Sequence, residues 1–219
     1  MQVTIAAATR LELKEDTIRQ ISKHEIDVLY TGVGLLSSAV NLAQYALQHQ
    51  PHLIIQAGIA GSLDPNLSLG DVVVVKQECL GDTGVQESGE WKDMFDMGFQ
   101  QADELPFTNR YIINEWLTKF NVLQLPAVTG ITINQITTHT DTIQMLQTKY
   151  GAQVESMEGA SLHYVCKLFN IPFIQIRAIS NYVGERDKSK WKIREAIANL
   201  NETVLRMLNN TELGYGSDR

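Results

Sequence analysis

The chain has 219 residues, 44% hydrophobic and 20% charged, a composition that suits one domain over residues 1–210 with a flexible tail at residues 211–219. Its formal net charge of −7 offers no basic surface to nucleic acid or to an anionic membrane, so neither is an expected partner. Cys79 and Cys166 are too few for a disulfide framework or a metal cluster. No signal peptide and no membrane helix are indicated, so we expect a cytoplasmic protein.

The hydrophobic pattern predicts strands that alternate with helices, which is typical of an α/β fold with parallel strands. The predicted strands cover residues 2–8, 26–30, 53–55, 72–75, 127–133 and 173–179, and the third of these ends in a glycine-rich loop at residues 58–62. The predicted helices cover residues 11–21, 109–120, 141–150, 158–169 and 191–208, and a further helix follows residue 34. Ser37 or Ser38 is the predicted N-cap of that further helix, and Asp141 is the predicted N-cap of the helix at 141–150.

A long glycine-rich and polar excursion interrupts this alternation at residues 78–107. Excursions of this size inside compact domains are usually functional. We expect it to close a pocket or to contact a second subunit, with disorder as the alternative.

Two segments late in the chain place polar side chains beside apolar elements. Residues 154–160, Val-Glu-Ser-Met-Glu-Gly-Ala, precede an apolar helix, and residues 176–181, Ile-Arg-Ala-Ile-Ser-Asn, end a strand. Ligands of open α/β sheets bind beyond the carboxyl ends of the strands. Both segments are therefore predicted to form walls of one pocket for a small polar ligand.

The order of several short motifs resembles the nucleoside phosphorylase and nucleosidase superfamily. They are Glu12, Gly-Val-Gly at residues 32–34, Gly-Ile-Ala-Gly-Ser at 58–62, Leu-Gly-Asp at 69–71, Met-Glu-Gly-Ala at 157–160 and Arg-Ala-Ile-Ser-Asn at 177–181. Residues 81–84, 155–158 and 180–187, with Trp191, look like the futalosine hydrolase subfamily. The resemblance implies a three-layer αβα fold with a mixed, partly closed sheet. It also implies hydrolysis of the N-glycosidic bond of futalosine, which releases hypoxanthine during menaquinone biosynthesis, with no cofactor.

The resemblance also implies catalytic roles for two carboxylates. Cleavage develops positive charge on the ribose, which carboxylates stabilise. Glu158 would accept hydrogen bonds from the ribose hydroxyls, Met157 would pack on the sugar, and Glu12 would orient or deprotonate the attacking water. From spacing alone, Glu158 could equally be a first-turn residue favoured by the helix dipole, and Glu12 a solvated helix residue.

Asn181 would contact the base in this resemblance. Its amide can donate to a 6-oxo group and accept from N7, which favours hypoxanthine over adenine; an Asx-turn is the alternative reading. Ser180 would bond Asn181 or the backbone. The remaining expected substrate contacts are Gly61, Ser62, Ile133 and Asn134, with Phe107 or Tyr182 as candidates to stack on the base.

Other assignments stay open at this stage. The roles of Glu155, Arg186, Asp187 and Trp191 and the group at C5′ of the ribose are not fixed, and a salt bridge at a helix start would also account for Arg186 and Asp187. No His or Cys spacing indicates a metal site, and the glycines at 32–34 lack a dinucleotide fingerprint. Arg10 is the only arginine near the glycine loops in the first half of the chain, which favours water over phosphate as the nucleophile.

Three alternatives to futalosine hydrolysis remain. These are an adenine-type methylthioadenosine/S-adenosylhomocysteine nucleosidase, a phosphate-dependent purine nucleoside phosphorylase and a non-catalytic nucleoside sensor. Since pockets in this superfamily are often completed by a neighbouring subunit, we expect a homo-oligomer, a dimer or larger.

Overall fold

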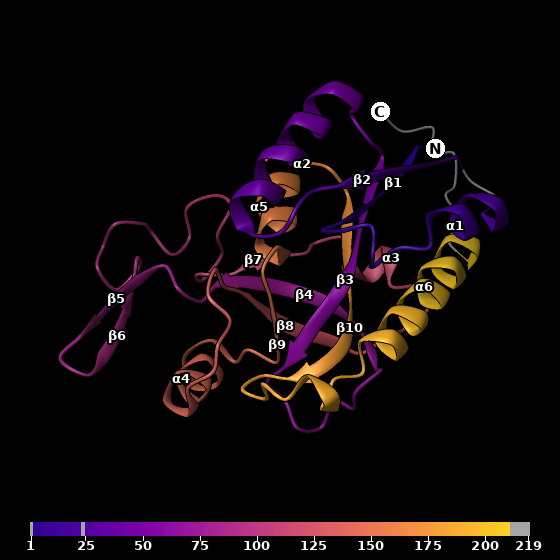
Figure 1. The fold of residues 1–219 in the computed structure, drawn as a ribbon. Coiled ribbons are helices and arrows are strands. Elements are labelled where there is room, and N and C mark those ends of the chain that lie inside the picture. The colour runs from indigo at the N-terminus through magenta and orange to yellow at the C-terminus, as the bar shows by residue number, and fades with distance from the viewer. Residues whose placement is uncertain (1, 23–24, 211–219) are drawn as a thin grey trace.

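A mixed sheet organises the computed structural model, which describes residues 2–22 and 25–210. Its strand order within these residues is β10-β4-β8-β9-β3-β1-β2, with β7 paired to β4 (Figure 1). The strands are β1 (Val3–Ala7), β2 (Ile26–Tyr30), β3 (Leu53–Ser62), β4 (Val72–Leu80), β7 (Ile112–Ile113), β8 (Ala127–Thr132), β9 (Val154–Ser156) and β10 (Phe173–Tyr182). A separate hairpin, β5 (Gly84–Glu87) and β6 (Glu90–Asp93), projects from the body (Figure 1).

The sheet is partly closed. Because β10 pairs with β3 as well as with β4, the strands β10, β4, β8, β9 and β3 form a ring, and β1 and β2 extend from β3. The β1–β2, β1–β3 and β3–β10 pairs are parallel, whereas β4–β10 and β3–β9 are antiparallel. This confirms the mixed, partly closed sheet that the resemblance implies.

Helices cover the two faces of the sheet. The helices are α1 (Glu15–Ile21), α2 (Leu35–His49), α3 (Leu117–Phe120), α4 (Thr140–Tyr150), α5 (Gly159–Phe169) and α6 (Ile193–Asn210), with a 3-10 turn, η1 (Lys188–Lys190). Val3, Ile5 and Ala7 pack in the cluster that contains α6 residues, whereas Ala6 packs in the cluster of α2 and α5 residues. Because helices cover both of its faces, β1 has apolar residues on both faces of the sheet.

Several predicted boundaries were wrong. The helix predicted from residue 11 begins at Glu15, and α2 begins at Leu35, so Ser37 and Ser38 lie inside it and do not cap it. Likewise α4 begins at Thr140 with no side-chain cap, so Asp141 is a first-turn residue. The strand predicted at residues 53–55 continues through the glycine-rich segment to Ser62.

In two regions the observed secondary structure is of a different type from the predicted one. Residues 109–120 form strand β7 and the four-residue helix α3 in place of one helix, and the short strand β9 was not predicted. The excursion predicted at residues 78–107 begins inside β4 and contains the β5–β6 hairpin. The predicted tail at residues 211–219 lies outside the described residues.

Candidate active site

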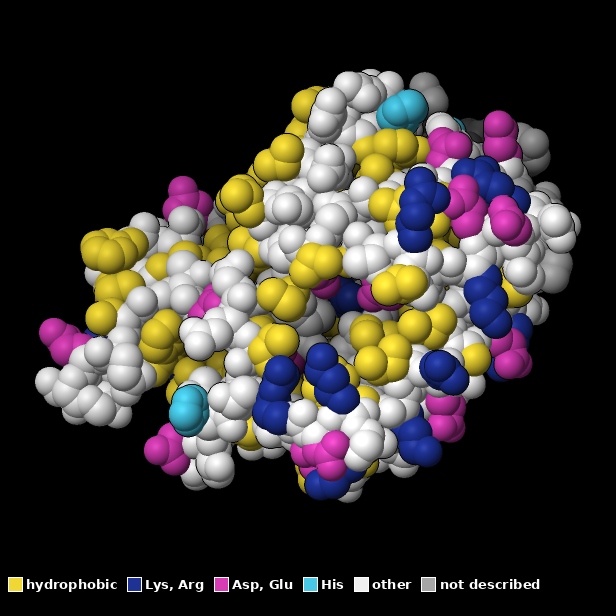
Figure 2. All heavy atoms as spheres, in the orientation of Figure 1, with side chains coloured by type: hydrophobic (Ala, Val, Ile, Leu, Met, Phe, Trp, Pro, Cys, Tyr) yellow, Lys and Arg dark blue, Asp and Glu magenta, His cyan; other side chains and the backbone are white. Residues whose placement is uncertain are grey.

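A cavity of about 400 Å³ opens where several strands end, and this volume lies in the range of small-molecule sites. Figure 2 shows a hollow near the centre of one face, with hydrophobic side chains around its rim and charged side chains at its floor. The lining comes from the carboxyl ends of β1, β3, β8, β9 and β10 and from the segments that follow them. The predicted position of the pocket, at the carboxyl edge of the sheet, is therefore correct.

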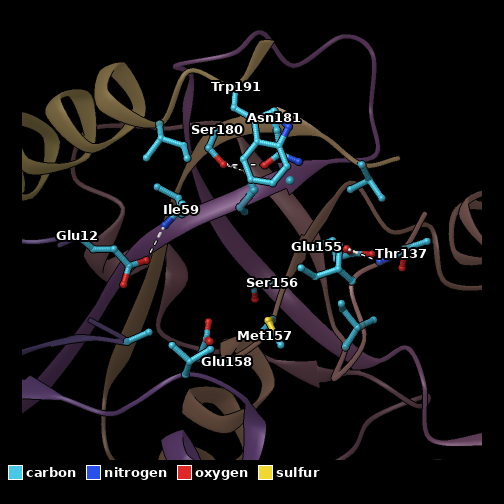
Figure 3. A pocket seen from close by; sticks show the side chains of 18 of the residues that line it. Glu12, Ile59, Thr137, Glu155, Ser156, Met157, Glu158, Ser180, Asn181 and Trp191 are labelled. Atoms are coloured by element: carbon cyan, nitrogen blue, oxygen red, sulfur yellow. Dashed lines mark hydrogen bonds between the residues drawn. The ribbon is translucent and has the colours of Figure 1, made fainter. Parts of the chain in front are cut away.

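Glu12 enters the cavity from the loop after β1 and is 8% exposed. Its Oε2 accepts hydrogen bonds from the Thr9 backbone N–H at 3.0 Å and the Thr9 hydroxyl at 3.3 Å, and its Oε1 accepts from the Ile59 N–H at 3.2 Å (Figure 3). A Cβ at Gly58 would lie 3.0 Å from this Oε1 and only 2.4 Å from Arg177 Nη1. Only glycine at position 58 leaves room for both charged groups.

Glu158 lies across the cavity from Ser180 and Asn181, at the N-terminus of α5 (Figure 3). Its Oε1 accepts a hydrogen bond from the Gly34 N–H at 2.9 Å, and its Oε2 is 3.9 Å from Nη1 of the buried Arg177. One backbone donor and one distant cation leave this carboxylate with spare acceptor capacity. Gly32 and Gly34 have φ angles of +80° and +92°, so the loop that presents this N–H before α2 favours glycine at both positions.

Asn181 lies near the carboxyl end of β10 and faces the same cavity. Its Oδ1 accepts a hydrogen bond from the Ser180 hydroxyl at 2.8 Å, so the predicted contact between these residues is present. Its Nδ2 donates to the Tyr182 carbonyl at 3.1 Å, and a Cβ at Gly61 would be 3.3 Å from this nitrogen. The amide is therefore oriented by neighbours on its own strand, with one hydrogen and one lone pair left for a ligand.

Glu155 lies on β9, at the side of the cavity away from Glu12 (Figure 3). Its Oε1 accepts a hydrogen bond from the Thr137 N–H at 3.2 Å, while its Oε2 is buried without a hydrogen-bond partner among the described residues. Burial raises the pKa of this carboxyl, and hydrogen bonding from Thr137 opposes the rise. Sequence reasoning had left this residue without a role.

Trp191 and Arg186 lie at the rim of the cavity. The Arg186 guanidinium carbon is 5.6 Å from the centroid of the Trp191 ring, and the indole Nε1 donates to the Glu185 carbonyl at 3.0 Å. Asp187 instead caps η1 by accepting from the Ser189 N–H at 3.0 Å. The predicted pair of Arg186 and Asp187 therefore separates into one residue at the cavity and one that stabilises a turn.

The structure brings most of the predicted site residues into one cavity. Those that line it are Glu12, Gly61, Ile133, Met157, Glu158, Ser180 and Asn181. Two others lie outside this lining: the Ser62 hydroxyl bonds the Asp64 backbone in a turn, and the exposed Asn134 donates to Asp82. Phe107, which packs on Phe95, and Tyr182, which donates to the Leu67 carbonyl, lie outside it as well, as does the excursion at residues 78–107.

A buried polar cluster behind Glu158 was not anticipated. Arg177 Nη2 donates to Gln56 Oε1 at 2.9 Å, and Gln175 Nε2 donates to Glu78 Oε1 at 2.9 Å. Burial raises the pKa of Glu78 to about 7. A charged residue inside an otherwise apolar strand, as in Ile-Arg-Ala at residues 176–178, was the available signal.

The described residues, 2–22 and 25–210, contain neither a metal-binding cluster nor a membrane-spanning helix. No group of three or more His, Cys, Asp or Glu side chains is placed to hold a metal ion in that part of the chain. Nor does any helix there have the length and apolarity needed to cross a membrane.

Comparison with known proteins identifies similar chains. The family model of the phosphorylase superfamily matches residues 14–209. The futalosine hydrolase of Thermus thermophilus is 30% identical over 184 residues, which cover 82% of this chain and 80% of that protein. The 5′-methylthioadenosine/S-adenosylhomocysteine nucleosidase of Glaesserella parasuis is 27% identical over 201 residues, covering 87% and 84%. In fold, the chain is similar to the crystal structure of the Helicobacter pylori 5′-methylthioadenosine/S-adenosylhomocysteine nucleosidase, with a TM-score of 0.77, 19% identity and coverage of 95% and 97%.

Proposed function

Because the chain belongs to the phosphorylase superfamily, we propose that it is a nucleosidase that hydrolyses the N-glycosidic bond of futalosine and releases hypoxanthine, a step of menaquinone biosynthesis. The similarity to a futalosine hydrolase supports this substrate. The observation that carries the proposal is that Glu12, Glu158 and Asn181 line one cavity. In the proposed arrangement the two carboxylates face the sugar and the amide faces the base.

Glu158 binds the ribose in this proposal. Since its Oε1 already receives the Gly34 N–H and its Oε2 is free of short contacts, the carboxylate can accept both hydroxyl hydrogens of a vicinal diol. Its charge also stabilises the positive charge that develops on the sugar in the transition state. Met157, beside it in the cavity, packs on the sugar.

Glu12 is the group that orients and deprotonates water. Its carboxylate is held by donors from Thr9 and Ile59, so its position is fixed before substrate binds. A fixed base within reach of the attacking water contributes about 10²- to 10⁴-fold to the rate.

Asn181 recognises the base. An amide supplies a donor to a 6-oxo group and an acceptor for the N7 proton of the departing base, whereas an aspartate would match a 6-amino group. Ser180 holds the amide in place, Gly61 leaves space beside it, and Ile133 contributes an apolar wall.

Water is favoured over phosphate as the nucleophile because the cavity offers little positive charge. Arg186 at the rim is the only Lys or Arg among the residues that line it, and Arg10 points elsewhere, with its guanidinium over the Tyr30 ring. An inorganic phosphate needs several donors or cations close to the sugar.

The test is chromatography of futalosine, inosine and methylthioadenosine after incubation with the enzyme, with and without phosphate. We expect hypoxanthine from futalosine at a rate that phosphate does not change. Adenine released from methylthioadenosine as the dominant product would support the adenine-type nucleosidase instead, and phosphate-dependent turnover would support a phosphorylase. Binding of futalosine without turnover would support the sensor.

We also propose that the enzyme is a homo-oligomer. The packed helices α2 and α5 expose large apolar side chains, including Leu36, Val40 and Leu168, and the excursion exposes Phe99. Contiguous exposed apolar surface is typical of protein interfaces. Sedimentation velocity should give a dimer or larger species that Val40→Asp dissociates, and a monomeric wild type would refute this assignment.

A further inference from the structure

Arg186 lies at the rim of the cavity, and its positive charge is unpaired among the described residues. Its guanidinium forms no ion pair or hydrogen bond with the described part of the chain, and its central carbon lies 5.6 Å from the centroid of the Trp191 ring. Both neighbouring carboxylates are engaged elsewhere, because Glu185 pairs with Lys190 at 2.6 Å and Asp187 caps η1. The turn therefore directs two adjacent acids away from this arginine.

Hydrogen bonds fix the position of the aromatic ring beside this cation. The Trp191 indole Nε1 donates to the Glu185 carbonyl at 3.0 Å, and the N–H of the next residue, Lys192, donates to the Ser180 carbonyl at 2.8 Å. Trp191 thus lies on the Ser180 side of the cavity, across from Glu158 (Figure 3). The ring and the guanidinium together form a wall that is apolar along its length and positively charged at its end.

The rest of the cavity is unfavourable for an anion. Its other ionisable lining residues are all acids, namely Glu12, Glu155, Glu158 and Glu185. Glu12 and Glu158 face the sugar in the proposed arrangement, so an anion bonded directly to the ribose would be repelled by both. Within this lining, only the position beside Arg186 offers an anion an attractive charge.

Apolar side chains surround the same opening. Leu11, Val33 and Ile136 line the cavity and are 82%, 56% and 48% exposed. Figure 2 shows hydrophobic side chains around the rim of the hollow. Exposed apolar surface around a pocket is typical of a ligand-binding groove. Together with one cation, this surface matches a ligand portion that is apolar along its length and negatively charged at its end.

We propose that Arg186 is a specificity-determining residue that binds a carboxylate at the end of an apolar C5′ substituent of the nucleoside, with Trp191 packed against the substituent. A guanidinium suits this role because it binds a carboxylate through two parallel hydrogen bonds. With the base at Asn181 and the ribose diol at Glu158, the C5′ substituent is the part that neither residue holds. This inference rests on the proposed function, because it requires a nucleoside bound in that orientation.

The first experiment uses a 5′-thioinosine that carries a carboxyphenyl group on sulfur, and its methyl ester, which lacks the charge. Wild type should prefer the acid by about 5- to 10-fold in kcat/KM, between the effects of an exposed ion pair and of a charged hydrogen bond. Arg186→Gln should raise KM for the acid by this factor at unchanged kcat, and should change the constants for the ester by less than about twofold. Arg194→Gln is the matched control, because Arg194 is exposed on α6 and does not line the cavity.

Three further measurements separate a charge contact from a structural effect. Arg186→Lys should retain part of the preference for the acid, because the positive charge remains. Added salt should reduce the preference in wild type, since an exposed ion pair is screened. Inosine 5′-monophosphate, whose anion lies next to the ribose, should be a poorer substrate than inosine. Equal constants for acid and ester in wild type, equal changes for both in Arg186→Gln, or a preference for the monophosphate over the aryl acid would overturn the assignment.

The second experiment measures binding by calorimetry and does not depend on turnover. It uses the matching acid and ester of 9-deazainosine, in which a carbon–carbon bond replaces the N-glycosidic bond. Wild type and Arg194→Gln should bind the acid at least about fivefold more tightly than the ester, and Arg186→Gln should bind both equally. A preference that depends on Arg186, in a protein that does not hydrolyse futalosine, would refute the proposed function and support this inference. Futalosine hydrolysis with equal binding of acid and ester, or with binding of neither, would refute the inference and leave the proposed function standing.

Discussion

Glu78 gives the sharpest test of the electrostatics under the active site. It is fully buried below the start of α5, where its Oε1 accepts from Gln175 Nε2 at 2.9 Å and its Oε2 accepts from the Thr132 hydroxyl at 3.0 Å. Burial raises the pKa of this carboxyl from 4.5 to about 7, although both hydrogen bonds and the charge of Arg177 oppose the rise. Replacing it by the isosteric amide in Glu78→Gln removes the titration and keeps the shape.

The expected effect depends on pH. Below pH 4.5 the carboxyl is protonated in the folded and the unfolded chain, so its ionisation costs the fold nothing. Between pH 4.5 and 7 the unfolded chain ionises this carboxyl while the folded protein keeps it protonated, so the free energy of unfolding falls over this range, by about 3 kcal/mol once both states are ionised above pH 7. The glutamine variant avoids this cost, so its free energy of unfolding relative to wild type should increase by about 3 kcal/mol between acid and alkaline pH.

Urea unfolding of both proteins at pH 5, 7 and 9 measures this difference. The exposed Glu90 of the β5–β6 hairpin provides the control, since Glu90→Gln removes a solvated carboxylate and should shift the free energy of unfolding by less than about 0.5 kcal/mol at each pH. A Glu78→Gln difference that is constant from pH 5 to pH 9 would refute the argument. It would mean that Glu78 ionises in the folded protein as it does in water.

Three further predictions concern turnover, each measured by steady-state kinetics of base release. Glu12→Gln should lower kcat by about 10²- to 10⁴-fold with little change in KM, because a general base acts in the transition state. Glu158→Gln should lower kcat and raise KM together, with a loss of about 1.5–3 kcal/mol in kcat/KM, because the ribose contacts exist in both states. Asn181→Asp should move the ratio of kcat/KM values toward 6-aminopurine nucleosides.

Each of these has a contradicting outcome. An effect of Glu12→Gln confined to KM would make this residue a binding group. Full activity in Glu158→Gln would remove it from the sugar site. An unchanged hypoxanthine-to-adenine ratio in Asn181→Asp would show that residue 181 does not contact the base edge.

Strands were the most predictable part of the fold because a strand that is buried on both faces consists of consecutive apolar residues. The strand at residues 53–55 was found from its apolar residues, all of which are buried. Its continuation to Ser62 was missed because glycines at positions 58 and 61 read as a loop. Both glycines are needed in the strand itself, since added Cβ atoms would collide with Arg177 or Val183. The space that the Arg177 and Val183 side chains need therefore places glycines in the strand, and these remove its local sequence signal.

The failures elsewhere have a common physical origin in tertiary contacts. The three residues of β9 are too few for an alternating pattern, and the strand exists because it pairs with β3 on one side and β8 on the other. The helix predicted at residues 109–120 gives way to β7, where Ile112 is buried against β4. Neither pairing partner is near in sequence, so no local pattern could indicate it.

The predicted site residues that line the cavity include those for which a motif gives both the residue type and its place at the end of a strand or the start of a helix. Asn181 and Glu158 are of this kind, and the structure places both in one cavity. Ser62 fell outside because one residue of register decides which face of a strand a side chain occupies. Asn134 lies beyond the end of β8, where its amide donates to Asp82. No role was predicted for Arg177 beyond its place in a motif, since its contacts with Gln56 on β3 and Glu158 at the start of α5 join residues far apart in the sequence.

The polar groups at the two ends of the cavity are held in different ways. This difference determines which property of the enzyme a substitution should alter. Glu12 and Glu158 are oriented by backbone N–H groups of Thr9, Ile59 and Gly34, which side-chain substitutions leave in place. Asn181 is oriented by the Ser180 hydroxyl and one carbonyl. In the proposed mechanism, base preference therefore depends on a few side chains, whereas the arrangement that cleaves the bond depends on the path of the main chain. Substitutions at the base end should accordingly alter which purine leaves before they abolish hydrolysis.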